Sequence, residues 1–232
     1  MKVAIAFVIV IAAITMAPSQ ASRPALAVAF LYDLTTSAVP LMLNKQVADD
    51  RQLEDVTGCL VAEIASTDTL RFGFITSHLY LSRPYAASEM PDFYRKVVRP
   101  TVVSPDNRAG PSPIWDAIDK TISSMTTDSG RRAVIVMTDG LSTGNVHSVS
   151  EVVDHANAAG VSISGIYAGN PFALWKEWPV HVGDTLSAIA SDTGGLYVVP
   201  KGEDYREVRQ TSPVSKRNLN KAIEQIFERL RR

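Results

Sequence analysis

Short, uninterrupted apolar runs alternate along this chain with segments whose apolar residues recur at helical spacing. Two of these runs, residues 25–32 and 133–137, contain no charged side chain. Strands that are apolar on both faces are typical of parallel sheets covered by helices on both sides. The alternation therefore predicts an α/β fold with three layers, in which helices cover both faces of an open, mostly parallel sheet.

The predicted strands span residues 25–32, 69–81, 133–137, 161–168 and 196–199, and the second of them is expected to bend or to form a hairpin. Apolar spacings of three, four and seven predict helices at 41–64, with a break near Asp49 and Asp50, and at 88–98, 113–122, 149–159, 185–191 and 219–230. Four prolines between residues 99 and 113 indicate a loop there. Because no internal repeat or second domain is visible, residues 22–232 are expected to form a single domain.

The first 21 residues have the pattern of a secretory signal peptide. Lys2 precedes a 14-residue apolar run, and the small residues Ser19 and Ala21 follow it, which predicts cleavage after Ala21. The run is shorter than the ~20 residues that a membrane-spanning helix needs, although an uncleaved amino-terminal anchor is the alternative. We expect a secreted or periplasmic protein with no stable membrane span after signal removal.

The composition excludes several classes of protein and of metal site. With 46% hydrophobic residues, 23 basic and 24 acidic side chains, the chain is neither disordered nor a basic nucleic-acid binder. Cys59 is the single cysteine and is expected to lie in the core, so thiolate clusters and internal disulfides are excluded. The four histidines have no ligand-like spacing, so oxygen atoms would have to hold any metal, which favours magnesium, manganese or calcium.

Oxygen-bearing side chains follow two of the predicted strands and precede one predicted helix. Asp33, Thr35 and Ser37 come directly after the first strand, Ser112 precedes the helix that begins near Pro113, and Asp139 follows the strand at 133–137. The carboxyl ends of parallel strands meet at one edge of the sheet, where ligands bind. These five residues are therefore candidate ligands of a divalent cation, with water completing its coordination.

Three segments of the sequence resemble the metal-ion-dependent adhesion site of von Willebrand factor type A domains. They are DLTTS at 33–37, GPSPIWDAI at 110–118 and RRAVIVMTDG at 131–140, and SDTGGLYVV at 191–199 is similar to the junction before the family's last strand. The resemblance covers residues 25–231 and is strongest to the exported bacterial branch called VWFA-related. It implies that Thr35, Ser37 and Ser112 coordinate the ion directly, whereas Asp33 and Asp139 hold its waters.

Three positions depart from the family pattern. Thr35 stands where the family usually has Ser, and Ser112 stands where it usually has Thr, so both keep a hydroxyl oxygen. Thr36 replaces a glycine and is bulkier.

The resemblance implies an exported module that binds another protein through a divalent cation, Mg²⁺ or else Mn²⁺ or Ca²⁺, without catalysis. The partner is expected to contribute an acidic side chain to the ion. Phe172, Trp175 and Trp178 lie in a long connection after the third apolar strand and could anchor that partner. The alternative is that these three aromatic side chains fold back over the core.

Two other functions compete with this interpretation. One is a magnesium-dependent phosphatase of the haloacid-dehalogenase type with Asp33 as nucleophile, in which Thr138 would supply the hydroxyl of the second strand motif. That enzyme would need an aspartate two residues after the nucleophile, where this chain has Thr35. The other is a binding module of the same fold that uses no metal.

Overall fold

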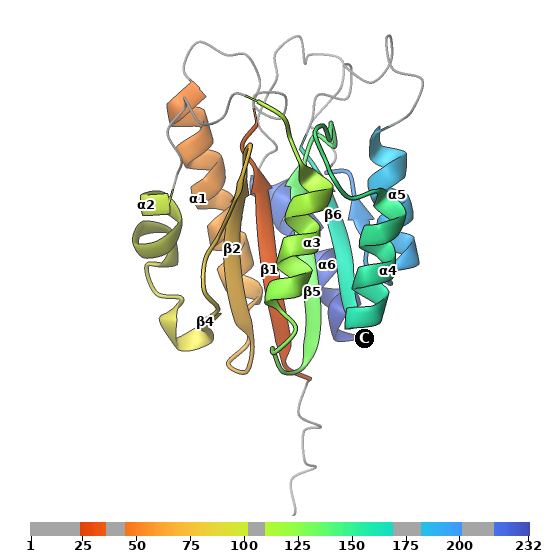
Figure 1. Ribbon diagram of the computed structural model, residues 1–232. Helices are drawn as coiled ribbons and strands as arrows, with labels where there is room; N and C mark the ends of the chain where they lie inside the picture. The colour runs from red at the N-terminus through yellow and green to blue at the C-terminus, as the bar shows by residue number, and fades with distance from the viewer. Residues whose placement is uncertain (1–23, 36–44, 102–109, 169–181, 201–215) are drawn as a thin grey trace, which may run out of the picture.

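A computed structural model of the chain describes residues 24–35, 45–101, 110–168, 182–200 and 216–232, without the side chains of 45–50, 101 and 182–184. One seven-stranded sheet forms the middle layer, in the order β3-β2-β1-β5-β6-β7, with β4 paired to β2 (Figure 1). The parallel strands are β1 (Leu26–Asp33), β2 (Thr69–Ile75), β5 (Arg131–Thr138), β6 (Val161–Tyr167) and β7 (Tyr197–Val198). The antiparallel strands are β3 (Leu79–Leu81) and β4 (Tyr85–Ala86). The predicted open, mostly parallel sheet and the hairpin at 69–81 are confirmed.

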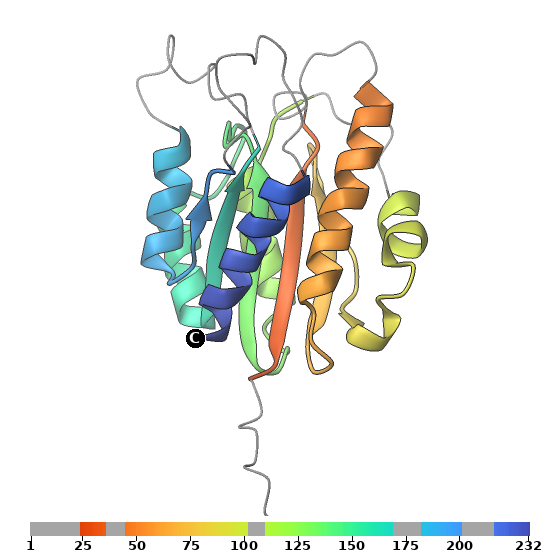
Figure 2. The same cartoon turned by 180° about the vertical axis from the view of Figure 1, so that it is seen from behind.

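Helices cover both faces of the sheet, as predicted. Helices α3 (Ile114–Ser124), α4 (Val149–Ala159) and α5 (Val182–Asp192) lie on the face seen in Figure 1. Helices α1 (Lys45–Glu63) and α6 (Lys216–Arg231) pack against each other on the opposite face (Figure 2). None of the helices in these described ranges combines the length and the apolarity that crossing a bilayer requires.

Two details of the predicted helices are wrong. Helix α1 runs without interruption through Asp49 and Asp50, because no proline or glycine occurs near them to break the hydrogen-bonded turns. The helix predicted at 88–98 is replaced by a 3₁₀ turn (Ala87–Glu89), a π-helical turn (Tyr94–Val98) and the short α2 (Arg99–Thr101). Pro91 lies between the first two of these turns, and a proline inside a helix would remove a main-chain hydrogen bond.

Successive residues of β1 enter two different cores. Leu26, Val28 and Phe30 pack with α1 and α6, whereas Ala27, Ala29 and Leu31 pack with α3, α4 and α5. Side chains alternate between the two faces of a strand, so Asp33 continues the second series and projects toward the face covered by α3. In β5, the residues Val134 and Val136 belong to that same core, and Thr138 continues their register.

The strand order changes direction around β1. From β1 the chain continues through α1 to β2 on one side, whereas β5 and then β6 lie on the other side. In open α/β sheets, such a change leaves a crevice outside the carboxyl ends of the two central strands. Asp33 and Thr138 are the last residues of β1 and β5, so both lie at this crevice.

Two glycines provide a matched test of the packing. A Cβ atom on Gly195, just before β7, would overlap the main-chain carbonyl oxygen of Ile163 in β6, whereas a Cβ on Gly58, inside α1, would meet no atom within 4 Å. We expect Gly195→Ala to lower the free energy of unfolding by about 2 kcal/mol or more. Gly58→Ala should raise it by about 0.5–1 kcal/mol. Urea unfolding of both variants measures the difference, and similar shifts in the two would contradict this packing.

Candidate metal centre

The Asp33 carboxylate is the centre of the candidate site. Its Oδ1 atom accepts hydrogen bonds from the main-chain N–H (2.9 Å) and the hydroxyl (2.7 Å) of Thr35. Its Oδ2 atom accepts from the hydroxyl of Thr138 at 2.6 Å and from that of Ser112 at 3.4 Å. The Asp33 residue is only 2% exposed. Hydroxyl groups from three separate segments therefore surround one buried carboxylate.

The register of the sheet explains why these groups meet. Tyr32 pairs with Met137 across β1 and β5, which sets Asp33 beside Thr138 on the face that α3 covers. Ser112 lies immediately before Pro113 and α3, so the start of that helix brings its hydroxyl to the same crevice. Thr35 follows two residues after Asp33. At this spacing, an aspartate side chain can accept a hydrogen bond from the main-chain N–H of the later residue.

Burial raises the pKa of Asp33, and the hydrogen bonds from Thr138, Thr35 and Ser112 oppose that shift. An ionised carboxylate in a buried position is costly unless hydrogen bonds or a positive charge compensate it. A bound cation would provide such a charge. A cation beside Asp33 would therefore reduce the free-energy cost of keeping this buried carboxylate ionised.

The donor set fits a hard cation. A hydroxyl group that donates its proton to a carboxylate still has oxygen lone pairs that can coordinate a metal ion. Thr35, Ser112 and Thr138 all donate in this way to Asp33. Hydroxyl and carboxylate oxygens are ligands suited to magnesium, manganese and calcium. Within the described ranges, no group of three or more acidic, histidine or cysteine side chains is arranged to hold a metal, so hydroxyls dominate this site.

Asp139 lies next to this cluster along the chain. It is 5% exposed, and its Oδ1 atom accepts a hydrogen bond of 2.9 Å from the main-chain N–H of Leu141. The N–H of Gly140 donates to the Thr138 hydroxyl at 2.9 Å, which fixes the turn that follows β5. Burial raises the pKa of Tyr167 at the end of β6, and the charges of Tyr197 and Asp139 add to that shift. Asp139 thus adds a second carboxylate to the carboxyl edge of the sheet.

The segment after β5 is joined to the start of α3 by reciprocal hydrogen bonds. The Ser112 N–H donates to the Thr143 hydroxyl at 3.0 Å, and the Thr143 N–H donates to the Ser112 carbonyl at 2.8 Å. The N–H of Trp115, in the first turn of α3, donates to the Asn145 side chain at 2.8 Å. These bonds fix Ser112 relative to the turn that carries Asp139.

A further carboxylate, Asp116, holds the far end of this segment. It accepts the main-chain N–H groups of Val146 and His147 and also contacts Nδ1 of the His147 ring at 2.9 Å. Burial opposes ionisation of Asp116, but the hydrogen bonds from His147 and Val146 outweigh it and lower its pKa. The same contact with Asp116 raises the pKa of His147. Asp116 is therefore a positioning residue for the segment that follows Asp139.

The structure brings together part of the predicted set. Asp33, Thr35 and Ser112 are in direct contact, and Asp139 follows at the same edge. Ser37 lies outside the described residues, as do the predicted partner contacts Phe172, Trp175 and Trp178 and the predicted signal peptide at 1–21. Cys59 is buried, as expected.

The metal site predicted from the sequence does not contain Thr138, whose hydroxyl has a role only in the phosphatase alternative. The alternation of Val134, Val136 and Thr138 was the available signal, since it sets the hydroxyl on the same face as Asp33. Thr143, which binds the backbone of Ser112, was also missed. No local pattern could reveal it, because its role depends on how the segment after β5 folds against α3.

No family model and no curated protein matches this sequence. Solved structures do match its fold. An aerotolerance-related membrane protein from Bacteroides fragilis, with multiple mutations to serines, is 15% identical with a TM-score of 0.59, over 88% of this chain and 98% of that one. The conserved hypothetical protein BatB from Bacteroides thetaiotaomicron is 17% identical with a TM-score of 0.53, over 88% of this chain and 99% of that one.

A von Willebrand factor type A protein from Catenulispora acidiphila is 9% identical with a TM-score of 0.57, over 87% of this chain and 41% of that one. At sequence identities this low, the similarity to these structures shows the fold alone. The sheet order, the helices on both faces and these structural likenesses agree: the chain has the fold of a von Willebrand factor type A domain.

Proposed function

We propose that this chain is a protein-binding module that uses a divalent cation, Mg²⁺ or else Mn²⁺ or Ca²⁺, to bind its partner. The residues that would hold the ion are Asp33, Thr35, Ser37, Ser112 and Asp139. The observation that carries the proposal is the buried Asp33 carboxylate, which accepts hydroxyl groups from three separate segments at the crevice between β1 and β5.

The two kinds of side chain have different roles. Thr35, Ser37 and Ser112 would bind the ion through neutral hydroxyl oxygens, whereas Asp33 and Asp139 would hold water molecules around it. Neutral ligands cancel none of the ion's charge, so the bound ion would supply a positive position that a carboxylate oxygen of the partner can occupy. Asp33 also keeps the Ser112 and Thr35 hydroxyls oriented, since both donate to it.

We assign the partner contact to Phe172, Trp175 and Trp178. They belong to the connection between β6, which ends at Tyr167, and α5. β6 runs parallel to β5, so this connection begins at the same carboxyl edge as the Asp33 site. Aromatic side chains are frequent anchors of protein interfaces.

The environment of Asp33 favours binding over catalysis. A nucleophilic aspartate has to reach the phosphorus atom of its substrate, but Asp33 is buried and both its oxygens accept hydrogen bonds from hydroxyls. Thr35 also occupies the position where a haloacid-dehalogenase-type phosphatase needs a carboxylate. The proposed module therefore performs no catalysis.

We further propose that residues 1–21 direct export and are removed. The structural likeness to an aerotolerance-related membrane protein is compatible with a site outside the cytoplasm. The charge pattern of residues 1–21, with Lys2 ahead of the apolar run, supports the same proposal.

Cation binding is tested by titrating the metal-free chain from Ser22 onward with Mn²⁺ or Mg²⁺ in a calorimeter. We expect binding that raises the melting temperature, since free ion at 100 times its Kd stabilises a protein by about 2.7 kcal/mol. Asp33→Asn and Ser112→Ala should lose this response. Asp33→Asn should keep or increase the stability of the metal-free protein, because it removes a buried carboxylate whose pKa is raised.

Asp154→Asn is the matched control, because it makes the same change at an exposed position on α4. It should bind the ion like the natural sequence. A natural sequence that shows neither heat nor a melting shift would favour the metal-free module of the same fold.

Partner binding is tested by a pull-down from an extract of the native organism, with and without a chelator. We expect a partner that is retained with Mg²⁺ or Mn²⁺ and released by the chelator, because its carboxylate would bind through the ion. Replacing both Trp175 and Trp178 by Ala should weaken retention without changing the heat of Mn²⁺ binding. Equal recovery of the partner under both conditions would count against a metal-mediated contact.

Export and cleavage are tested by the intact mass of the protein recovered from the producing cells. We expect a chain that begins at Ser22, because the small residues Ser19 and Ala21 precede the predicted cleavage point. A mass that retains residues 1–21, together with recovery in the membrane fraction, would instead identify an uncleaved anchor.

A further inference from the structure

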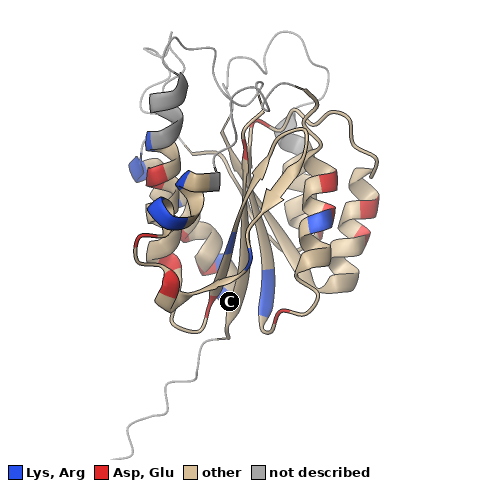
Figure 3. Ribbon diagram, turned by 60° about the vertical axis from the view of Figure 1, so that its left-hand side comes forward, with Lys and Arg blue, Asp and Glu red and all other residues tan. Residues whose placement is uncertain are grey.

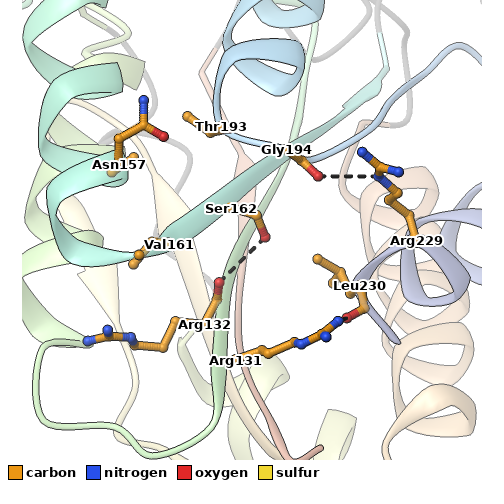
Figure 4. A pocket seen from close by; sticks show the side chains of 11 residues that line it. Arg131, Arg132, Asn157, Val161, Ser162, Thr193, Gly194, Arg229 and Leu230 are labelled. Atoms are coloured by element: carbon orange, nitrogen blue, oxygen red, sulfur yellow. Dashed lines mark hydrogen bonds between the residues drawn. The ribbon is translucent and has the colours of Figure 1, made fainter. Parts of the chain in front are cut away.

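A pocket lies at the opposite end of the sheet from the Asp33 site. It has a volume of about 260 Å³ and lies at the amino ends of β5 and β6, beside the last turn of α6 (Figure 4). We name it the basic pocket, because its lining includes Arg131, Arg132 and Arg229. Figure 3 shows basic segments toward this lower end of the sheet. The basic pocket is thus separate from the candidate metal centre.

The three arginines of the basic pocket have no acidic side chain as a partner within the part of the chain that is described. Their hydrogen bonds all go to main-chain oxygen atoms. Arg131 donates to Leu230 and Arg232 at 3.0 and 3.4 Å, Arg132 to Thr126 at 3.2 Å and Arg229 to Gly194 at 3.3 Å. By contrast, Arg71, Arg83, Arg95 and Arg231 each pair with a carboxylate. Among the described residues, no acidic side chain therefore neutralises the positive charges of the basic pocket.

These guanidinium groups retain unused donors. Each one carries five N–H donors, and the bonds to carbonyls use two on Arg131 and one each on Arg132 and Arg229. The Nε atom of Arg132 is buried and has no hydrogen-bond acceptor among the described residues. A buried donor without an acceptor is rare in folded proteins, because it loses its bond to water. This Nε atom is closed to solvent, so the donors that a ligand can reach are those of the exposed Arg131 and Arg229.

The register of β5 sets arginines on both faces of the sheet. Arg131 and Arg132 are consecutive strand residues, so their side chains project to opposite faces. Arg131 reaches the end of α6 at Leu230, and a Cβ on Gly160, at the end of α4, would lie 3.6 Å from a terminal nitrogen of Arg132. Figure 4 shows Arg131 and Arg229 on the α6 side and Arg132 extending the other way. The guanidinium groups of Arg131 and Arg132 therefore lie on opposite faces of the sheet at the amino end of β5.

We propose that the basic pocket binds a phosphate-bearing anion. The planar fork of a guanidinium matches the oxygen atoms of phosphate and can bind two of them at once. A dianionic phosphate offers several acceptors and compensates more charge than a single carboxylate. The pocket has room for more than the phosphate itself, so the ligand is a small organic phosphate or the headgroup of a phospholipid. This site does not depend on the proposed cation or on its partner.

The primary test is calorimetric titration of the purified protein with inorganic phosphate, at constant ionic strength and in the presence of EDTA. We expect saturable binding that weakens about tenfold or more when Arg131 and Arg229 are both replaced by Gln, because charge-assisted hydrogen bonds are lost. Arg217→Gln is the matched control, since Arg217 is an exposed arginine of α6 that does not line the pocket. It should bind phosphate like the natural sequence.

A second variant keeps all three arginines in place. Asn157 is exposed on α4 and lines the basic pocket, so Asn157→Asp adds a negative charge there without changing the core. We expect it to weaken phosphate binding several-fold, whereas Asn220→Asp, at an exposed position of α6, should not. This pair tests the pocket even if the double arginine variant unfolds.

Vesicle sedimentation distinguishes the two sources of phosphate. Binding to vesicles of phosphatidylcholine with phosphatidylglycerol, but not to phosphatidylcholine alone, and competition by free phosphate would identify a lipid headgroup. Phosphate binding without vesicle binding would identify a soluble ligand. The proposal is overturned if neither phosphate nor the vesicles bind. It is equally overturned if vesicle binding resists phosphate, or if the Arg131, Arg229 and Asn157 variants bind like their controls.

Discussion

The hydrogen bond between the Thr138 hydroxyl and the Asp33 carboxylate, at 2.6 Å, joins the ends of the two central strands. It depends on the pairing of β1 with β5, because only that pairing sets two residues 105 positions apart beside each other. Asp33 is buried, so this contact and those from Thr35 and Ser112 replace the water that the carboxylate would otherwise bind. The candidate site is therefore a consequence of strand order.

The two faces of the sheet contribute differently to this edge. On the face of α1 and α6, β1 buries the larger Leu26, Val28 and Phe30. On the other face, β1 contributes Ala27, Ala29 and Leu31 to the core that it shares with α3 and α4. The start of α3, and with it Ser112, reaches the carboxyl edge on this second face, where the Ser112 hydroxyl contacts Asp33.

The parallel sheet also separates two chemically different ends. The helices run opposite to the strands, so α3 begins beside the Asp33 site, whereas α4 and α6 end beside the basic pocket. Positive side chains are favourable near helix carboxyl termini, where carbonyl groups lack partners within the helix. This explains why Arg131 donates to a carbonyl at the end of α6 and Arg229 to the carbonyl of Gly194, just after α5. The remaining donors of both arginines are left for a ligand.

The layers of the fold and most of its elements follow from the sequence, since apolar runs such as 133–137 and helical spacings such as 219–230 depend on local periodicity. It also predicts that Asp33, Ser112 and Asp139 lie at the carboxyl edge of the sheet, because these residues lie next to element ends that the same periodicity predicts. Only the tertiary structure assigned Thr138 to the carboxylate, joined Thr143 to Ser112 and gathered Arg131 with Arg229. Each of these contacts links residues that are far apart along the chain, and they become neighbours only through strand order and helix packing, which local sequence does not specify.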